Sequence, residues 1–381
     1  MRQAAAGVLL TLGASLGAAC GGDDTLADEL CRVVPGPAGA PARLGEGPMC
    51  THLASYRLFA DLGAQAPADG VEAYDLATPL FSDYALKRRF IWLPDGAAAP
   101  MSWSDVDTFT VPVGAVIVKT FSMPHDLRAP AAGERLLETR VLVHRSTGWE
   151  GASYVYPDGS ELGGAVDDAL LTAGARTLDV TFADDAGPHQ LAYGVPSKNE
   201  CKNCHEEHAE VMGPIGPKAR HLNRDAVAPA SGNQLAGLIA AGHLVGAPAD
   251  PATWPRTPRF DDAADGTLEA RARGWLDINC AHCHNPTGPA ITSGLDLSIG
   301  QLEPYRYGVC KPPVAAGQGS GGRRWGIVPG QPDASILVYR LEATAADVKM
   351  PELGRTLVHA EGVALVRAWI SSLTGDCDAV R

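Results

Sequence analysis

The chain has 381 residues, enough for two or three domains, and its 45% hydrophobic and 20% charged residues are typical of a protein that folds. Glycine (43) and proline (29) are frequent without reaching the level of a low-complexity chain, so many turns and rather little regular structure are expected. The formal net charge of -13 excludes nucleic acid as a partner, because phosphate backbones are bound by surfaces rich in Lys and Arg.

The first twenty residues predict export and a lipid anchor. Arg2 precedes an apolar stretch from Ala4 to Leu16, and the small residues 17–19 stand directly before Cys20. This order is typical of a signal peptide over residues 1–19. A cysteine at this place resembles the lipobox of bacterial lipoproteins, so we expect lipidation of Cys20 and a location on the periplasmic side of a bacterial membrane. The alternative is an ordinary cleaved signal that leaves Cys20 as a spare thiol.

Residues 20–52 and 53–195 differ in character. The first segment is small and polar and is interpreted as a tether. In the second, Pro157-Asp158-Gly159 predicts a turn, because Pro sets the first turn angle and Gly accepts a positive φ. The same segment holds short β-rich runs at residues 89–93, 114–121, 138–144 and 152–156. We therefore expect a compact, mainly antiparallel β domain over residues 53–195.

Helical patterns replace the β-rich runs after Pro196. Residues 196–258 contain a first Cys-x-x-Cys-His motif and a short amphipathic pattern at 233–244. Residues 259–381 contain a stronger amphipathic helix at 267–279, which leads directly into a second such motif, and a terminal helix at 361–373. The expected fold is α+β and multidomain, with the β domain first and a helical region after it.

The two motifs predict covalent haem. Two thiols three residues apart can add to the two vinyl groups of one haem, and the adjacent His then lies against the iron as its proximal ligand. We expect two haem c groups, and a helix, a motif, a long loop and a terminal helix follow one another as in a cytochrome c domain. Residues 196–258 are thus the first haem-binding region and residues 259–381 the cytochrome c-like domain with the second haem. The motif residues are Cys201, Cys204 and His205, and Cys280, Cys283 and His284.

Zinc and disulfides are the alternatives for the four motif cysteines. A tetrahedral zinc site uses two Cys pairs that usually lie about 15 to 20 residues apart, whereas residues 205–279 separate these pairs and each carries a following His. An oxidising compartment could instead close each pair as a disulfide. For the other four cysteines we expect pairs 31–50 and 310–377, although three pairings are open to them.

The second axial ligands are sought among Met and His residues. A cytochrome c iron usually takes Met opposite the His, and the thioether raises the reduction potential. Met350, in the loop before the terminal helix, is predicted for the second haem, with an ordinary core Met as its alternative. For the first haem Met212 is predicted, if its Gly- and Pro-rich loop turns back over the iron; His208, His221 or His243 would instead make a bis-His site, and a five-coordinate iron would bind peroxide.

Several runs resemble a family of exported bacterial diheme c-type cytochromes of unassigned physiological role, over roughly residues 53 to 373. The resemblance implies two covalent haems and electron transfer, and it supplies no substrate. The runs are Asp75-Leu-Ala-Thr-Pro-Leu-Phe-Ser-Asp-Tyr-Ala, Pro214-Ile-Gly-Pro-Lys-Ala-Arg, Leu276-Asp-Ile-Asn-Cys-Ala-His-Cys-His-Asn-Pro, Ile327-Val-Pro-Gly and Met350-Pro-Glu-Leu-Gly-Arg-Thr-Leu-Val-His.

The predicted function is an electron carrier or relay between periplasmic redox proteins, held at the membrane by its lipid anchor. The acidic surface suits a basic partner. One alternative is a haem enzyme of the diheme peroxidase type. Another is a redox-sensing binding module in which the β domain holds a ligand, and the Lys87-Arg88-Arg89 cluster belongs either to its binding face or to a solvated strand edge.

Overall fold

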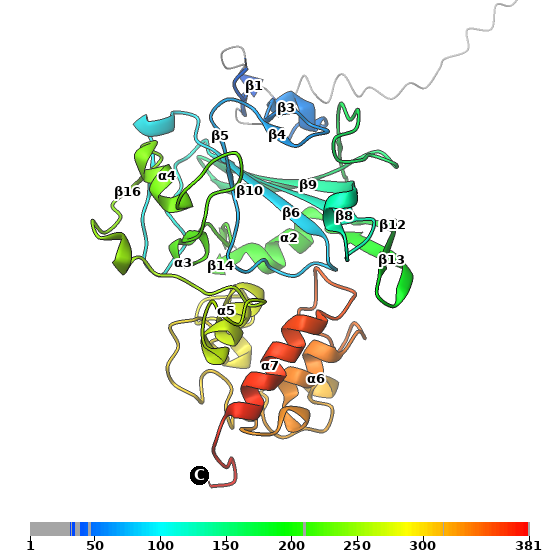
Figure 1. Cartoon of the computed structure of the whole chain (residues 1–381), viewed down its shortest axis with the longest axis vertical. Helices are drawn as coiled ribbons and strands as arrows, with labels where there is room; N and C mark the ends of the chain where they lie inside the picture. Colours follow the sequence, from blue (N-terminus) through cyan, green and yellow to red (C-terminus); the bar gives the residue numbers. More distant parts are fainter. Residues whose placement is uncertain are drawn as a thin grey trace, which may run out of the picture.

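The computed structural model describes residues 31, 33–34, 39–44, 47–208, 211–314 and 316–379. The predicted signal peptide and Cys20 lie outside these residues. Within them, no helix is long and apolar enough to cross a membrane. The described chain forms a β-sheet body and, on one side of it, a group of C-terminal helices (Figure 1). An antiparallel sheet followed by helices is the α+β arrangement expected from the sequence.

A six-stranded antiparallel sheet with the order β11-β10-β9-β8-β6-β5 forms the body. Its four longest strands coincide with the four β-rich runs of the sequence, because β-branched and aromatic residues alternate there with smaller or polar ones. The strands are β5 (Val71–Tyr74), β6 (Leu86–Trp92), β8 (Val116–Pro124), β9 (Glu134–Arg145), β10 (Gly148–Val155) and β11 (Leu170–Leu171). The predicted turn lies shortly after the end of β10, with Gly159 at φ 77°.

Both faces of the sheet are covered. On one face, Val116 and Val118 of β8 pack into a cluster with Tyr56. That cluster also buries Cys31 and Cys50, so the described end of the predicted tether is packed on the sheet. Ile117, which points the other way, packs into a second cluster with residues of the 219–254 segment. This second face lies toward the motif-bearing helices.

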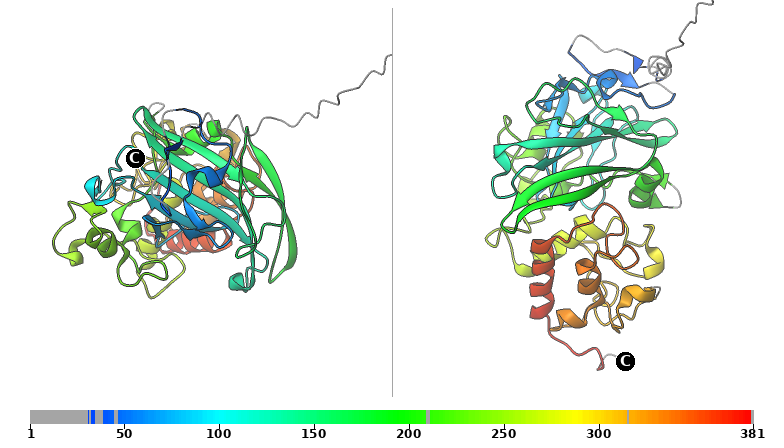
Figure 2. Two further views of the ribbon diagram at one scale, coloured as in Figure 1. Left: turned by 90° about the horizontal axis from the view of Figure 1, so that it is seen from above. Right: turned by 90° about the vertical axis from the view of Figure 1, so that its right-hand side faces the viewer.

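A long hairpin that the sequence interpretation did not single out covers one end of the sheet. It consists of β12 (Arg176–Asp184) and β13 (Gly187–Val195), paired along their whole length. Its inward residues Val180, Phe182 and Tyr193 join Phe121 and Met123 of β8 in a third hydrophobic cluster. Figure 2 shows this hairpin wrapped along the side of the body.

Short strands and helices complete the body. The strands are β1 (Val33–Val34), β2 (Arg43–Leu44), β3 (Phe59–Asp61), β4 (Ala66–Pro67), β7 (Met101–Ser102), β14 (Glu206–His208), β15 (Val211–Met212) and β16 (Leu244–Val245). The helices are α2 (Lys198–His205), α3 (Ala219–Leu222) and α4 (Gln234–Ala240), and α4 lies inside the amphipathic pattern at 233–244. Leu222, Leu235 and Leu238 of α3 and α4 share the second cluster with the sheet, so this region is built on the β body.

The C-terminal group consists of α5 (Leu268–Cys280), α6 (Ile336–Glu342) and α7 (Ala360–Ser372) around its own hydrophobic cluster. α5 and α7 match the predicted helices to within one residue. They cross in close contact: a Cβ on Gly362 of α7 would lie 2.6 Å from the Trp275 Nε1 of α5. The first and last helices of this region therefore pack across each other.

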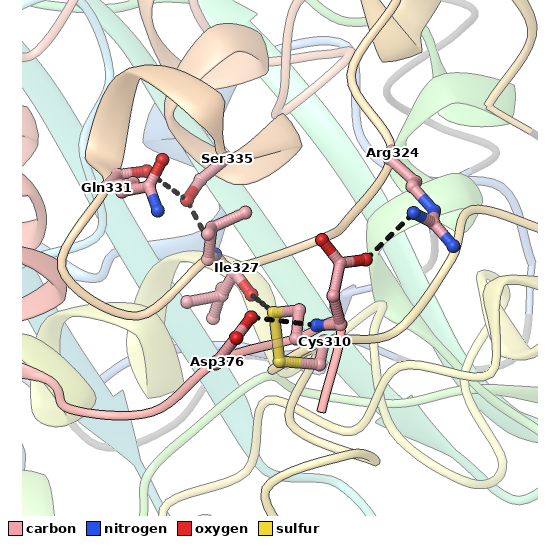
Figure 3. The surroundings of a disulfide bond; sticks show 9 residues. Cys310, Arg324, Ile327, Gln331, Ser335 and Asp376 are labelled. Carbon is pink, nitrogen blue, oxygen red and sulfur yellow. Dashed lines mark hydrogen bonds and ion pairs between the residues drawn. A yellow bond between two sulfur atoms is a disulfide. The ribbon is translucent and has the colours of Figure 1, made fainter. Parts of the chain in front are cut away.

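Two disulfides are formed among the described cysteines, Cys31–Cys50 and Cys310–Cys377. This is the predicted pairing. The second bond ties the chain end to the segment before α6 (Figure 3), where Ser335 Oγ donates to Gln331 O and accepts from Val328 N. The four motif cysteines remain free thiols, so the alternative in which each Cys-x-x-Cys pair closes on itself is not the observed one.

Candidate haem site

The first motif lies on a short, well-capped helix. Ser197 accepts a hydrogen bond from Glu200 N, and the Glu200 carboxylate accepts from Ser197 N, which closes a capping box at the start of α2. Cys201 and Cys204 are one turn apart on this helix, and His205 is its last residue. The sequence places both thiols and the ring on one short segment because helical spacing brings residues three and four apart to the same side.

His205 is held in one tautomer. Its Nδ1 lies 2.9 Å from Gly213 O, and because a carbonyl only accepts, Nδ1 carries the hydrogen and Nε2 keeps its lone pair. Burial, with a contribution from Lys119, lowers the pKa of His205 to about 3. The ring is therefore neutral at physiological pH, which is the form that ligates iron through Nε2.

His284 of the second motif has the same arrangement. Its Nδ1 lies 3.0 Å from Ser293 Oγ, which donates its own hydrogen to Ala290 O and so accepts from the ring. Burial lowers the pKa of His284 to about 4. Cys280 ends α5 and is buried, which raises the pKa of its thiol to about 12. Among the described residues, neither motif histidine has a hydrogen bond at Nε2, the donor atom that a haem iron takes.

The fold brings the two motifs together. One ligand atom each of Cys204, His282 and Cys283 lie within 4.8 Å of one another, and Cys283 Sγ is 3.8 Å from Asn203 O. The hydrogen bond from Cys283, with His282 beside it, holds the pKa of the Cys204 thiol well below its usual range. Residues 205–279 separate the motifs in the sequence, so this proximity is a product of the tertiary structure alone.

A pocket opens beside the first motif, between the sheet and the segment 213–221, and is called the sheet pocket below. Ile117, Leu142 and Gly151, which share one face of the sheet, line it together with Cys201 and His205, and their apolar surface suits the face of a porphyrin. The lining is completed by residues 74, 76, 80, 87, 89, 119, 140, 141, 152, 215, 216, 218, 221 and 278. A larger cavity of about 430 Å³ is lined by residues 53–54, 57–62 and 164–167 and by neither motif.

The two predicted methionine ligands have different surroundings. Met212 is buried on β15, opposite Glu206 in the hairpin that follows His205, and its methyl group packs over Gly151, since a Cβ there would lie 2.9 Å from Met212 Cε. Met350 is half-buried and donates its N–H to Arg340 O at 2.9 Å. Met212 is not part of the described lining of the sheet pocket, and both ligations stay predictions.

The loop that carries Met350 lies beside the second motif. Burial raises the pKa of the Cys280 thiol, and the nearby Arg355 guanidinium partly opposes this rise. Glu352 contributes to the raised pKa of Cys283, after the hydrogen bond to Cys204 and burial. Lys349 donates to Arg355 O at 2.9 Å, and Arg355 in turn donates to Met350 O at 2.7 Å, so the loop is internally braced.

The histidine alternatives differ in their surroundings. His221 is 2% exposed and lines the sheet pocket; its Nε2 is 2.8 Å from Asp277 Oδ2, and in the described structure its buried Nδ1 has no hydrogen-bond partner. His243 lies 3.4 Å from Glu72 Oε1 and outside the pocket lining. The side chain of His208 falls outside what is described. His221 is thus the histidine alternative best placed toward the first motif.

Residues to which the sequence interpretation gave no role join the two halves of the site. Arg220 Nε lies 2.7 Å from Asp277 Oδ2, linking α3 to α5 one turn before Cys280. Asp83 accepts from Thr356 N at 2.7 Å and from Leu357 N at 2.6 Å, just after the Met350 loop. These five residues all lie in the sequence runs that carry the family resemblance. Those runs were the signal in the sequence that could have identified them.

Comparisons with protein-family models, curated proteins and solved structures find no match for this chain.

Proposed function

We propose that the protein is an exported, lipid-anchored, two-haem c-type cytochrome that carries electrons between periplasmic redox partners. The observation that carries the proposal is the meeting of the two Cys-x-x-Cys-His motifs, with Cys204 and Cys283 side by side. Two cofactors attached at neighbouring sulfurs would be anchored close together, as a relay requires. Each haem would supply one reversible Fe(III)/Fe(II) couple.

The histidine geometry supports haem rather than an adventitious match to the motif. His205 and His284 each donate Nδ1–H to a fixed acceptor and keep Nε2 free. Cys201 and Cys204 would hold the first haem, and Cys280 and Cys283 the second. Met350 and Met212 are proposed as the opposite ligands, and the crossing of α5 and α7 agrees with a cytochrome c-like region at 259–381.

The charge supports a basic partner. The net charge of -13 favours association with a positively charged donor or acceptor, and the rate of that association should fall as salt rises. The lipid anchor at Cys20 would keep the relay at the membrane surface. In this proposal the residues of the chain attach, orient and bury the two haems.

A metal site is a second candidate, favoured by the cluster of Cys204, His282 and Cys283. Distance along the sequence does not argue against it, because folding closes the gap between the motifs. However, three ligands leave zinc one short of its usual four protein ligands in a structural site. That site would also leave Cys201, Cys280 and both oriented histidines without a role.

A haem count with metal analysis tests the proposal. Protein purified from the periplasm of a cytochrome c-maturing host should give two haems per chain as pyridine haemochrome, and Cys280→Ser with Cys283→Ser should give one. Low-spin bands that do not change with peroxide or carbon monoxide are expected for a relay. A high-spin component that reacts would favour the peroxidase, and colourless protein that contains zinc would overturn the haem proposal.

A further inference from the structure

The sheet pocket has an unusual charge. Five cationic side chains line it and, among the described residues of its lining, no carboxylate does: Lys87, Arg89, Lys119, Arg140 and Lys218. Burying positive charge in a mostly apolar pocket is costly unless an anion accompanies it. The pocket also contains Cys201 and His205, so the charge surrounds the place of the first motif.

Three of these cations are directly opposite one another in register. Arg89 of β6 pairs with Lys119 of β8, and Lys119 pairs with Arg140 of β9. Like charges directly opposite on neighbouring antiparallel strands repel each other and destabilise the sheet. Lys87 lies two residues before Arg89 on β6, on the same face of the sheet, and is opposite Phe121. We use the name cation row for the three paired residues together with this neighbouring Lys87.

The cation row is only half neutralised within the protein. Arg89 lies 2.7 Å from Asp75 Oδ1, and the other oxygen of this carboxylate pairs with Arg224. Arg140 lies 2.5 Å from Glu138 Oε1. Lys87 donates to a carbonyl, Ala85 O, at 2.8 Å.

Lys119 has the least compensation. In the described part of the chain its ammonium has no hydrogen bond or ion pair, and it stands 5.3 Å from the centre of the Phe121 ring. Burial, then Arg140 and Arg89, lower the pKa of Lys119 to about 7. An anion in the pocket would remove this cost.

We propose that the cation row binds the carboxylate groups of the cofactor attached at Cys201 and Cys204. The inference rests on the proposed function and deepens it, since it assigns residues to the two propionates that every haem carries. Among the described residues, Arg89 and Arg140 are the members of the cation row that pair with a carboxylate, so the row keeps positive charge to which the propionates can bind. In this assignment the β-sheet binds the propionates of the first haem, and α2 supplies the cysteines and the histidine.

Redox titration of the haem-loaded full chain tests this assignment. Lys119→Met should lower the midpoint potential of one haem, because a nearby cation stabilises the electron that reduction adds. Lys119→Arg should keep the wild-type value. The matched control is Arg324→Met, which removes one positive charge from an exposed ion pair with Asp378 (Figure 3) and should leave both potentials unchanged.

The outcomes separate the two proposals. If the chain carries two haems, but Lys119→Met and Lys87→Met have the same midpoint potentials as Arg324→Met, the cation-row assignment is overturned. The proposal of a two-haem cytochrome would stand. Wild-type protein without haem would overturn both. If Lys119→Met does not accumulate, Lys87→Met on the neighbouring strand gives the same decision. A wild-type potential that shifts on addition of inorganic phosphate would identify a free anion as the occupant and would also overturn the assignment.

Discussion

His205 and His284 show what a single residue needs to become a haem ligand. Each ring is half-buried and has its Nδ1 bonded to an acceptor only eight or nine residues further along the chain, Gly213 or Ser293. Burial lowers both pKa values, so the neutral ring is available over the whole physiological range. The sequence identifies the two histidines through the motif, whereas their acceptors follow no local rule and were found only in the structure.

At this scale we predict the effect of Met350→Ala. If Met350 ligates the second iron, the variant should convert one haem to high spin and lower its potential, because the thioether favours Fe(II). Visible spectra of both redox states and a redox titration measure the two effects.

The control for Met350→Ala is Met123→Ala. Met123 is fully buried in the hydrophobic cluster of β8 and the β12–β13 hairpin. Its truncation should cost roughly 2 to 5 kcal/mol of unfolding free energy and leave the spectra unchanged. A Met350→Ala protein with wild-type spectra would remove Met350 from the ligands.

Among the elements, α5 and α7 are the pair on which the second motif depends. α5 is capped by Thr267, whose side chain accepts from Ala270 N, and it ends at Cys280. Its Trp275 packs against α7 where Gly362 leaves room for the indole. Periodicity predicted both helices because their apolar residues recur at helical spacing. The close approach of α7 to α5 at Gly362 could not be predicted from periodicity. A glycine inside a helix is unfavourable by itself, and the sequence pattern does not show that it makes room for a side chain of another helix.

We therefore predict opposite effects for two Gly→Ala changes. Gly362→Ala should destabilise the protein by about 1 to 3 kcal/mol, because the new Cβ would overlap the Trp275 ring. Gly237→Ala in α4 should instead stabilise it by about 0.5 to 1 kcal/mol, because nothing lies within 4 Å of the added atom. Denaturant unfolding measures both. Equal gains at the two sites would show that the helix crossing tolerates the methyl group.

Over the whole molecule, a few buried polar contacts hold the sheet body against the C-terminal helices. Asp277 of α5 accepts from Arg220 and His221 of α3, and also from Ile299 N. Asp83, between β5 and β6, accepts from Thr356 and Leu357. These links hold the two motif-bearing regions together, so the distance between Cys204 and Cys283 depends on them.

Asp277→Asn tests this coupling. The variant leaves Arg220 buried without its counter-charge and should cost on the order of 3 to 5 kcal/mol of unfolding free energy. Asp378→Asn, at the exposed pair with Arg324, should cost no more than about 1 kcal/mol. A loss at Asp277 no larger than at Asp378 would contradict the structural role.

The pH dependence of stability follows from the same contact. Burial raises the pKa of Asp277, but the bonds from His221 and Arg220 outweigh it and hold the folded-state pKa well below its usual range. The unfolded chain then binds the proton more readily, so the contribution is complete above about pH 5 and is lost as the pH falls below about 4. Unfolding free energies measured from pH 7 to pH 3 should decline less in Asp277→Asn than in the wild type. Parallel curves would contradict the assignment.

The sequence by itself determined the two Cys-x-x-Cys-His motifs, the four main strands and the two long helices, and it favoured the disulfide pairing that forms. These are local properties: motif spacing, alternation, helical periodicity and the number of cysteines left over. Only the tertiary structure decided that the two motifs meet, that Arg89, Lys119 and Arg140 share a row, and that Asp277 joins α5 to α3. Contacts between distant segments depend on how whole faces pack, and no residue pattern along the chain records which faces will meet.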